Sequence, residues 1–245
     1  MVRFSVAGVG ADGIVQPASW APLTAFAAAL LAIWWLAKGR LSTLILDHPT
    51  HRSLHDSPIP RTGGLGLHAG ILLAAGIIAP NLPAALWIAL GVLLLVSFFD
   101  DARGIPVILR LASHLAVCGS FAAIVLYPGH GPLVIVLATL ALAWIANLFN
   151  FMDGSDGLAG GMALIGFSCY GAAAWLAGST EFALVNFSIA AAAAAFLIFN
   201  FHPARIFMGD AGSVPLGFLA AALGLIGWLQ GDWTWWFPLL VFSPF

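Results

Sequence analysis

Long apolar runs, repeated along almost the whole chain, constrain this sequence more than any other feature. Of the 245 residues, 62% are hydrophobic and only 7% are charged. A soluble domain carries about 25% charged residues, because its surface must be wetted. Apolar outward-facing side chains suit a bilayer, and a helix satisfies its own backbone there. The runs therefore predict membrane-spanning helices.

The pattern predicts an all-α, polytopic transmembrane helical bundle with about nine helices in this chain. The expected ranges are 20–41, 67–80, 83–99, 106–127, 132–150, 158–178, 182–200, 214–230 and a ninth from Trp233 to Phe245. We expect the second and third to be short, with Pro80 and Pro83 at the turn between them. No repeat or low-complexity segment divides the chain, so we treat 1–245 as a single integral membrane domain. The first residues lack the pattern of a removable signal peptide.

Polar residues are distributed unevenly between the two ends of these helices. The segments that follow helices one, three, five and seven contain seven of the ten acidic residues: Asp47, Asp56, Asp100, Asp101, Asp153, Asp156 and Asp210. Four arginines lie in the same segments: Arg52, Arg61, Arg103 and Arg205. Because Lys and Arg favour the cytoplasmic side, we expect these segments in the cytoplasm and the N-terminus outside.

Composition also excludes several classes of protein. The net charge of −2 gives no indication of a nucleic-acid partner. Cys118 and Cys169 both lie in apolar runs, which argues against a disulfide framework or a zinc site. A transporter would be expected to carry ionisable groups near mid-span, where this chain has only His114.

Amide and carboxylate side chains recur every three residues at the end of the fifth predicted helix. They are Asn147, Asn150, Asp153 and Asp156, with glycines that let the backbone approach a ligand closely. Oxygen ligands of this kind suit Mg²⁺, which one or two carboxylates and substrate phosphates usually hold. Helix capping remains the alternative for each residue taken alone.

Paired carboxylates, Asp100 and Asp101, follow the third predicted helix directly. Two adjacent carboxylates repel each other, and a cation or a shared proton would relieve the repulsion. A raised pKa on one of them would make it a general base. A solvated turn at the interface is the alternative interpretation.

A further carboxylate, Asp210, lies in the glycine-flanked segment 207–213 before a helix. Backbone N–H groups at such a helix start can bind an anion. His202 and Arg205 lie just upstream and are candidates for contact with phosphate or sugar. A histidine at a membrane interface is more often structural, and that alternative stays open for His202.

The first polar loop adds basic side chains, Arg52, His55 and Arg61, which suit phosphates. Their alternative role is a positive anchor on the cytoplasmic side. Together the loops supply carboxylates, amides and arginines on one membrane face. A divalent metal, a pyrophosphate and a membrane-borne acceptor would satisfy all of them, as in metal-assisted phosphoryl chemistry.

Four ordered motifs in these loops resemble the polyprenyl-phosphate N-acetylhexosamine-1-phosphate transferases of glycosyltransferase family 4. The motifs are Asp47-x-Pro-x-x-Arg-x-x-His-x-x-Pro-x-Pro-Arg-x-Gly-Gly64, Asp100-Asp101, Asn147-x-x-Asn-x-x-Asp-Gly-x-Asp-Gly-Leu-Ala-Gly160 and Phe207-Met-Gly-Asp-Ala-Gly-Ser213. The first loop is more similar to the O-antigen-initiating branch than to the peptidoglycan branch. The resemblance implies a Mg²⁺-dependent enzyme of the bacterial inner membrane, with Mn²⁺ as an alternative metal. The implied donor is a UDP-N-acetylhexosamine and the implied acceptor is undecaprenyl phosphate, giving undecaprenyl-diphosphate-sugar and UMP.

The resemblance also implies roles for individual residues. Asp210 and Asn150 would be metal ligands, and Asp100 would accept a proton from the lipid phosphate or position it. Asp101 and Asp153 would complete the catalytic set, and Arg110 would meet the lipid phosphate. The implied substrate-binding residues are Asp156, Asn147, Arg52, His55, Arg61, Arg110, His202 and Arg205.

Members of that family continue past a ninth helix into a cytoplasmic loop with a histidine-rich motif, whereas this sequence stops at Phe245. We therefore expect a truncated catalytic domain, with ten or eleven helices in the full protein. A Mg²⁺-dependent intramembrane prenyltransferase and an intramembrane aspartyl protease are the rival enzymes. A homodimer is compatible with the sequence, because helices that are apolar all round carry no mark of an oligomer interface.

Overall fold

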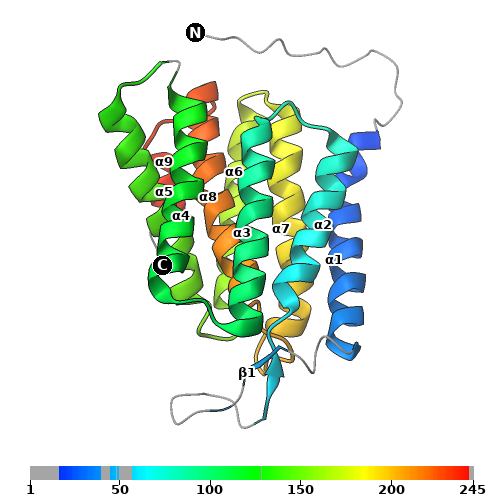
Figure 1. Cartoon of the computed structure of the whole chain (residues 1–245). Coiled ribbons are helices and arrows are strands. Elements are labelled where there is room, and N and C mark those ends of the chain that lie inside the picture. The colour runs from blue at the N-terminus through cyan, green and yellow to red at the C-terminus, as the bar shows by residue number, and fades with distance from the viewer. Residues whose placement is uncertain (1–16, 40–44, 48, 50–56, 128, 243–245) are drawn as a thin grey trace.

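The computed structural model describes residues 17–39, 45–47, 49, 57–127 and 129–242, and this part of the chain forms a helical bundle (Figure 1). A short 3₁₀ turn, Pro17–Trp20, leads into the first helix. The helices are α1 (Ala21–Lys38), α2 (Gly63–Ile78), α3 (Ala84–Arg103), α4 (Val107–Leu126), α5 (Pro132–Met152), α6 (Leu158–Leu176), α7 (Thr180–Asn200), α8 (Asp210–Gln230) and α9 (Phe237–Phe242). Two short strands, β1 (Leu46–Asp47) and β2 (Ile59–Pro60), pair antiparallel beside one end of the bundle.

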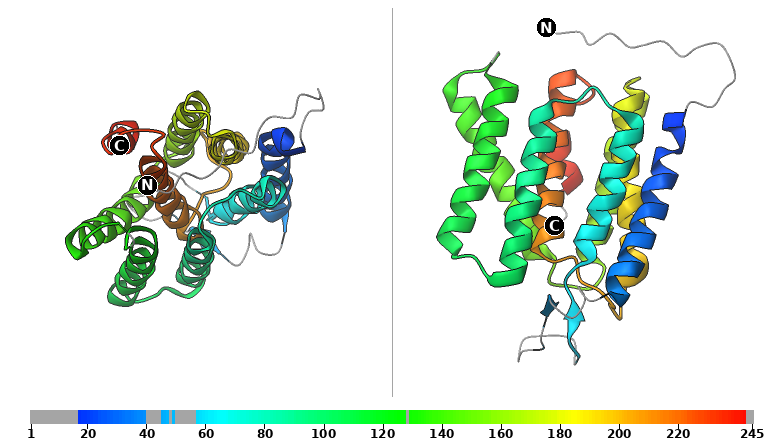
Figure 2. Two further views of the ribbon diagram at one scale, coloured as in Figure 1. Left: turned by 90° about the horizontal axis from the view of Figure 1, so that it is seen from above. Right: turned by 45° about the vertical axis from the view of Figure 1, so that its right-hand side comes forward.

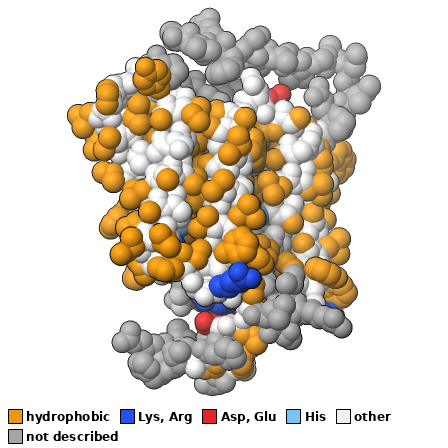
Figure 3. Space-filling view, in the orientation of Figure 1, with side chains coloured by type: hydrophobic (Ala, Val, Ile, Leu, Met, Phe, Trp, Pro, Cys, Tyr) orange, Lys and Arg blue, Asp and Glu red, His pale blue; other side chains and the backbone are white. Residues whose placement is uncertain are grey.

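The all-α, polytopic membrane architecture predicted from the apolar runs is confirmed. Within the described residues, seven helices are long and apolar enough to cross a membrane, and α2 is a shorter apolar helix. Apolar side chains cover the visible flank of the bundle, while Lys and Arg side chains gather at its lower end (Figure 3). That distribution suits a hydrocarbon band bounded by a polar surface.

The predicted starts of α2 and α8 and the predicted end of α3 were wrong, because these helices continue past the apolar run, whereas α1 ends at Lys38 rather than at 41. α2 begins at Gly63 rather than at residue 67, and α8 begins at Asp210 rather than at 214. α3 was expected to be short and to end at 99, but its 20 residues include Asp100 and Asp101. A helical backbone does not stop where hydrocarbon stops. Carboxylates at its last or first turn lie at the membrane surface, where their charge is tolerated.

The ninth helix also differs from its prediction. In the described residues α9 has only six residues and does not include Trp233. The indole of Trp233 folds back onto α8, donating from Nε1 to the Gly224 carbonyl (3.0 Å) and stacking on Tyr170 with ring centroids 4.9 Å apart. This packing holds the chain in a turn before α9 begins.

Close helix packing depends on glycines in α2 and α8. A Cβ at Gly70 would lie 2.5 Å from the Ala25 carbonyl oxygen of α1, and one at Gly217 would lie 2.8 Å from the Ala146 Cα of α5. Glycines allow two backbones to approach closely in lipid, where van der Waals contact drives association. α8 lies at the centre of the bundle, with most of its side chains buried (Figure 2). Its first turn therefore emerges among the ends of the other helices.

Candidate active site

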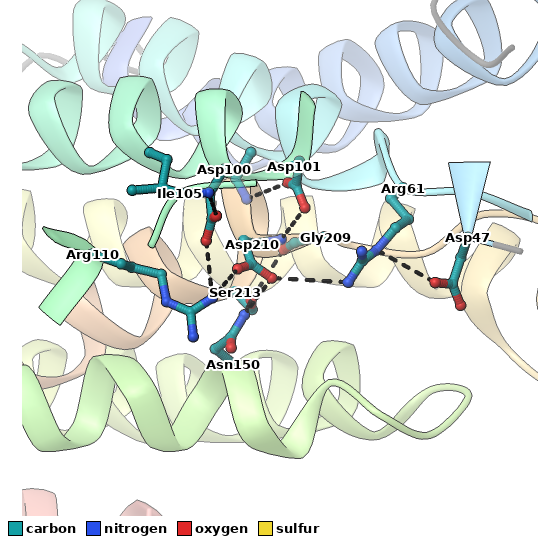
Figure 4. A network of polar contacts seen from close by, with 11 residues as sticks. Asp47, Arg61, Asp100, Asp101, Ile105, Arg110, Asn150, Gly209, Asp210 and Ser213 are labelled. Atoms are coloured by element: carbon teal, nitrogen blue, oxygen red, sulfur yellow. Dashed lines mark hydrogen bonds and ion pairs between the residues drawn. The ribbon is translucent and has the colours of Figure 1, made fainter. Parts of the chain in front are cut away.

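The carboxylate of Asp210, in the first turn of α8, is the centre of a polar cluster at the lower end of the bundle (Figure 4). Asn150 Nδ2 donates to its Oδ1 at 2.8 Å, and Arg110 Nη1 donates to its Oδ2 at 3.3 Å. Arg61 Nη2 lies 3.9 Å from the same Oδ1. Only 13% of the Asp210 side chain is exposed, so its charge is surrounded by these protein donors and not by water. Side chains from α4, α5 and the segment before α2 thus converge on one carboxylate of α8.

The close approach of α5 and α8 explains how Asn150 reaches Asp210. Gly217, two turns into α8, packs directly on the backbone of Ala146, one turn before Asn150. The two antiparallel helices are consequently near enough for Asn150 Nδ2 to bond both Asp210 and Ser213 Oγ (3.0 Å).

Asp101 closes the N-terminus of α8, although it belongs to α3. Its Oδ1 accepts the Asp210 N–H at 3.1 Å and its Oδ2 accepts the Ala211 N–H at 2.8 Å. Such a carboxylate satisfies free backbone donors and complements the positive end of the helix dipole. Gly209, with φ of 72°, makes the turn that permits this contact.

Asp100 faces a different partner from its neighbour. Its Oδ2 accepts from Arg110 Nη1 at 2.9 Å, and its Oδ1 accepts the Ile105 N–H at 2.6 Å. The same Arg110 nitrogen therefore bridges Asp100 and Asp210. The repulsion expected between the paired aspartates is relieved by an arginine on one and a helix N-terminus on the other.

The first loop is held to the Asp210 segment through backbone hydrogen bonds. Gly63 N–H donates to the Phe207 carbonyl (2.9 Å), Gly64 N–H donates to Met208 (3.0 Å), and Phe207 N–H donates to Pro60 (2.8 Å). Arg61 is placed in the cluster by these bonds. Two other predicted site residues of this loop, Arg52 and His55, lie outside the described residues.

Asp153 lies just after α5, outside the helices, and its carboxyl group has a shifted pKa. Burial raises its pKa well above the usual carboxyl range, Arg61 opposes this, and the charges of Asp210 and Asp101 raise it further. A carboxyl group in such surroundings holds its proton to higher pH than an ordinary aspartate.

Asp156 and His202 form a second polar group beside the cluster. Asp156 Oδ2 accepts the Ala204 N–H at 3.0 Å and lies 2.9 Å from His202 Nδ1. Asn200, which was not predicted as a site residue, connects the two loops by accepting from Gly157 N–H and donating to the Ile206 carbonyl. In the sequence, its position at a predicted helix end is the feature that could have indicated a role near the site.

Two predicted site residues have other partners. Asn147 Nδ2 donates to the Ala143 carbonyl of its own helix (2.7 Å), one turn deeper than Asn150. Arg205 Nη2 donates to the Ile198 carbonyl (2.7 Å), and its guanidinium lies 5.3 Å from the Phe199 ring centroid. Neither side chain is hydrogen-bonded to the Asp210 cluster.

The donor set around Asp210 suits a cation that phosphates help to hold. Within the described residues, no group of three or more His, Cys, Asp or Glu could by itself cage a metal ion. Mg²⁺ does not need such a cage, since one or two carboxylates and substrate oxygens complete its shell. A metal on Asp210 would replace one of its present nitrogen contacts, and the Asn150 amide, if reversed, would present Oδ1 to the same point. Asp210 and Asn150 therefore fit the ligand role.

Comparison with known proteins identifies the family. The family model described as glycosyl transferase family 4 matches residues 83–228. The chain belongs to glycosyl transferase family 4. The match runs from the start of α3 almost to the end of α8, and so includes Asp100, Arg110, Asn150 and Asp210.

Curated members of the family are similar to this chain over part of their length. An undecaprenyl-phosphate alpha-N-acetylglucosaminyl 1-phosphate transferase of Escherichia coli O157:H7 is 34% identical over 71% of this chain and 53% of its own. A probable undecaprenyl-phosphate N-acetylglucosaminyl 1-phosphate transferase of Bacillus subtilis is 29% identical over 74% of this chain and 55% of its own. A decaprenyl-phosphate N-acetylglucosaminephosphotransferase of Mycolicibacterium smegmatis is 30% identical over 90% of this chain and 63% of its own. The chain thus spans little more than half the length of the curated relatives it matches.

Proposed function

We propose that this chain transfers an N-acetylated sugar-1-phosphate from a UDP-sugar to undecaprenyl phosphate, giving undecaprenyl-diphosphate-sugar and UMP. The enclosure of Asp210 by Arg61, Arg110 and Asn150 at one end of the bundle carries the proposal. Such a site combines a potential metal ligand with cations for two phosphorylated substrates. The names of the relatives, which act on undecaprenyl or decaprenyl phosphate, support the same reaction class.

N-acetylglucosamine is the first sugar to test, because the relatives are named for it. We place the reaction at the bacterial inner membrane, as the first membrane step of a surface polysaccharide such as O-antigen. The exposed cations Lys38, Arg103 and Arg205 share the site's end of the bundle, which supports a cytoplasmic orientation.

In the proposed reaction an oxygen of the lipid phosphate attacks the β-phosphorus of the UDP-sugar. The bond from that phosphorus to the bridging oxygen breaks, and UMP leaves with the electron pair. A phosphomonoester with its second pKa near 6 is already mostly dianionic at neutral pH, so a strong base is not required. Holding the two anions in line is then the main contribution of the protein.

Arg110 is suited to bind the acceptor phosphate and Arg61 to bind the pyrophosphate of the donor. Asp100, bonded to Arg110 and to a backbone N–H, suits a positioning role better than that of a base. Asp210 and Asn150 would hold Mg²⁺, or Mn²⁺ in its place. The ion, when bound, supplies neutralisation of charge on the phosphates.

The test is UMP release by the purified chain in detergent, with undecaprenyl phosphate, Mg²⁺ and a panel of UDP-N-acetylhexosamines. The Escherichia coli relative serves as the positive control for the assay. We expect release that requires the lipid, disappears with EDTA and disappears in Asp210→Ala. Release of pyrophosphate from a prenyl diphosphate instead would indicate a prenyltransferase. Peptide cleavage that survives EDTA would indicate a protease.

A further inference from the structure

His114 is a fully buried histidine one helical turn beyond Arg110 in α4. Neither ring nitrogen has a hydrogen-bond partner within the described part of the chain. Ser97 in α3 is similar, because it is 2% exposed and its Oγ is also without a partner there. Ser97 precedes Asp100 by about one turn, and the Asp100–Arg110 ion pair joins the two helices. Ser97 and His114 therefore lie at the same depth, just beneath the cluster.

Leaving these atoms unpaired would be costly in the middle of a membrane protein. Buried polar groups in proteins are almost always satisfied, and where protein atoms do not do so, ordered water does. A buried water needs two to four polar partners. Asp100, Asp210 and Arg110 lie close enough to interact electrostatically with His114, and the Asn147 side chain on α5 lies close enough to contribute a hydrogen bond to one ring nitrogen after a small adjustment. The surroundings are thus polar enough for water.

Arg110 has donors left for such a water. Both of its ion pairs, to Asp100 and Asp210, are made through Nη1 alone, whereas a guanidinium carries five N–H donors on three nitrogens. An imidazole can accept from one neighbour through one nitrogen and donate to another through the other. His114 is therefore chemically able to connect Arg110 with Ser97 through water.

We propose that His114 is a positioning residue for Arg110. With Ser97 it holds ordered water beneath the guanidinium and so fixes the orientation in which Arg110 meets the acceptor phosphate. The role of Arg110 toward the acceptor phosphate rests on the proposed function. The hydrogen bonds of His114 do not depend on it. The neutral imidazole is sufficient for this role.

The kinetic test compares His114→Leu, which removes both nitrogens, with His114→Asn, which keeps a donor and an acceptor. For His114→Leu we expect kcat/KM for undecaprenyl phosphate to fall by about 10- to 100-fold, by analogy with the loss of a residue that orients a metal ligand. The KM for the UDP-sugar should not change. His114→Asn should recover most of the loss, and Ser97→Ala should show a smaller defect of the same kind.

Asn186→Leu is the matched control. Asn186 is fully buried in α7 and also has an unpartnered Oδ1 within the described residues. It precedes Asn200 at the site's end of α7 by about 21 Å along the helix axis. Its replacement should leave both kinetic parameters unchanged. The proposal is overturned if His114→Leu retains wild-type kinetics for the lipid, or if His114→Asn is as impaired as His114→Leu.

A second measurement does not depend on turnover. In protein labelled with ¹⁵N-histidine, the His114 signals can be identified by their loss in His114→Asn. We expect the chemical shifts of an imidazole hydrogen-bonded at both nitrogens. Shifts of an unbonded imidazole would contradict the proposal even if the wild type were inactive on every sugar tested, an outcome that would separately refute the proposed function.

Discussion

At the scale of single residues, the site depends on one negative charge shared among several donors. Asp210 keeps Arg61 and Arg110 near each other, since both guanidiniums approach its carboxylate. Removing that charge would leave Arg110 paired with Asp100 and Arg61 near Asp47, with no carboxylate that contacts both guanidiniums. It would also remove the first candidate ligand for a metal.

We therefore expect Asp210→Asn to lower kcat by about 100- to 1,000-fold, the effect of removing one strong electrostatic contact from a transition state. UMP release under saturating donor and lipid measures it, and thermal unfolding in detergent tests whether the variant is folded. A folded variant with wild-type kcat would exclude Asp210 from the reaction.

Arg110 offers a sharper test, because its role depends on geometry as well as charge. Lysine is a point charge on a flexible stem and cannot reproduce a fixed guanidinium that bridges two carboxylates. We expect Arg110→Lys to lower kcat/KM for the lipid acceptor by at least about tenfold. Arg103→Lys is the matched control, since Arg103 is an exposed arginine at the end of α3, and it should behave as wild type. Equal activity of both variants would contradict the bridging role.

Asp232, in the turn after α8, is an acid remote from the cluster. Its Oδ1 accepts from Ser179 Oγ at 2.6 Å, while Oδ2 is buried without a partner in the described structure. Burial raises its pKa, and the Ser179 hydrogen bond opposes the rise. The folded protein then binds this proton more tightly than the unfolded chain. Stability should fall as pH rises from the ordinary carboxyl range through the raised pKa, and stay constant above it.

Asp232→Asn keeps an acceptor for Ser179 but cannot ionise. Its melting temperature should exceed that of the wild type at pH 7, and the difference should disappear near pH 3, below both pKa values. Thermal unfolding in detergent across this pH range measures the effect. UMP release should not change, because Asp232 lies at the opposite end of α8. A constant difference at all pH values would show that the charge is not responsible.

At the scale of elements, the start of α8 is fixed by two other segments. Asp101 of α3 accepts its first N–H groups, and the start of α2 packs backbone to backbone against it. A Cβ at Gly64 would lie 2.2 Å from the Gly212 Cα, which no side-chain movement could relieve. The position of Asp210 is thus set by α2 and α3 together.

Gly64→Ala should therefore push α2 and α8 apart, lowering both the melting temperature and UMP release, with a loss of stability of about 1–3 kcal/mol or more. Gly76→Ala in the same helix is the matched control, since nothing lies within 4 Å of a Cβ there. It should be neutral or slightly stabilising, because alanine favours a helix over glycine. Equal behaviour of the two variants would mean that the contact does not position Asp210.

At the scale of the whole molecule, the apolar runs predicted the architecture but not the contacts. The ranges for α4 to α7 agree within two residues, because hydrocarbon imposes both length and composition. Asn147 and Asn150 belong to the same motif, yet one bonds its own helix and the other reaches Asp210. That difference depends on how α5 is rotated about its axis relative to α8. Close packing at Gly217 determines this rotation, and the sequence motif does not predict it. The capping of α8 by Asp101 was unpredictable for the same reason.

The orientation in the membrane can be tested with single cysteines. After both native cysteines are replaced, Ser155→Cys would mark the site's end of the bundle and Gly129→Cys the opposite end; both positions are exposed. In intact bacterial spheroplasts, a membrane-impermeant maleimide should label Gly129→Cys but label Ser155→Cys only after lysis. The reverse pattern would place the site outside the cell.

The short helix α2 has a consequence for the lipid around it. Its 16 residues span about 24 Å, less than the roughly 30 Å of a typical hydrocarbon core. The backbone bonds of Gly63 and Gly64 fix its first turn at the site's end, so the whole shortfall lies at the other end, where Ala79 turns the chain. The bilayer beside that turn must become thinner so that the peptide groups of the turn stay in contact with water. The leaflet opposite the candidate site is therefore expected to be thinner beside the turn between α2 and α3, giving the protein a preference for thin or easily deformed bilayers.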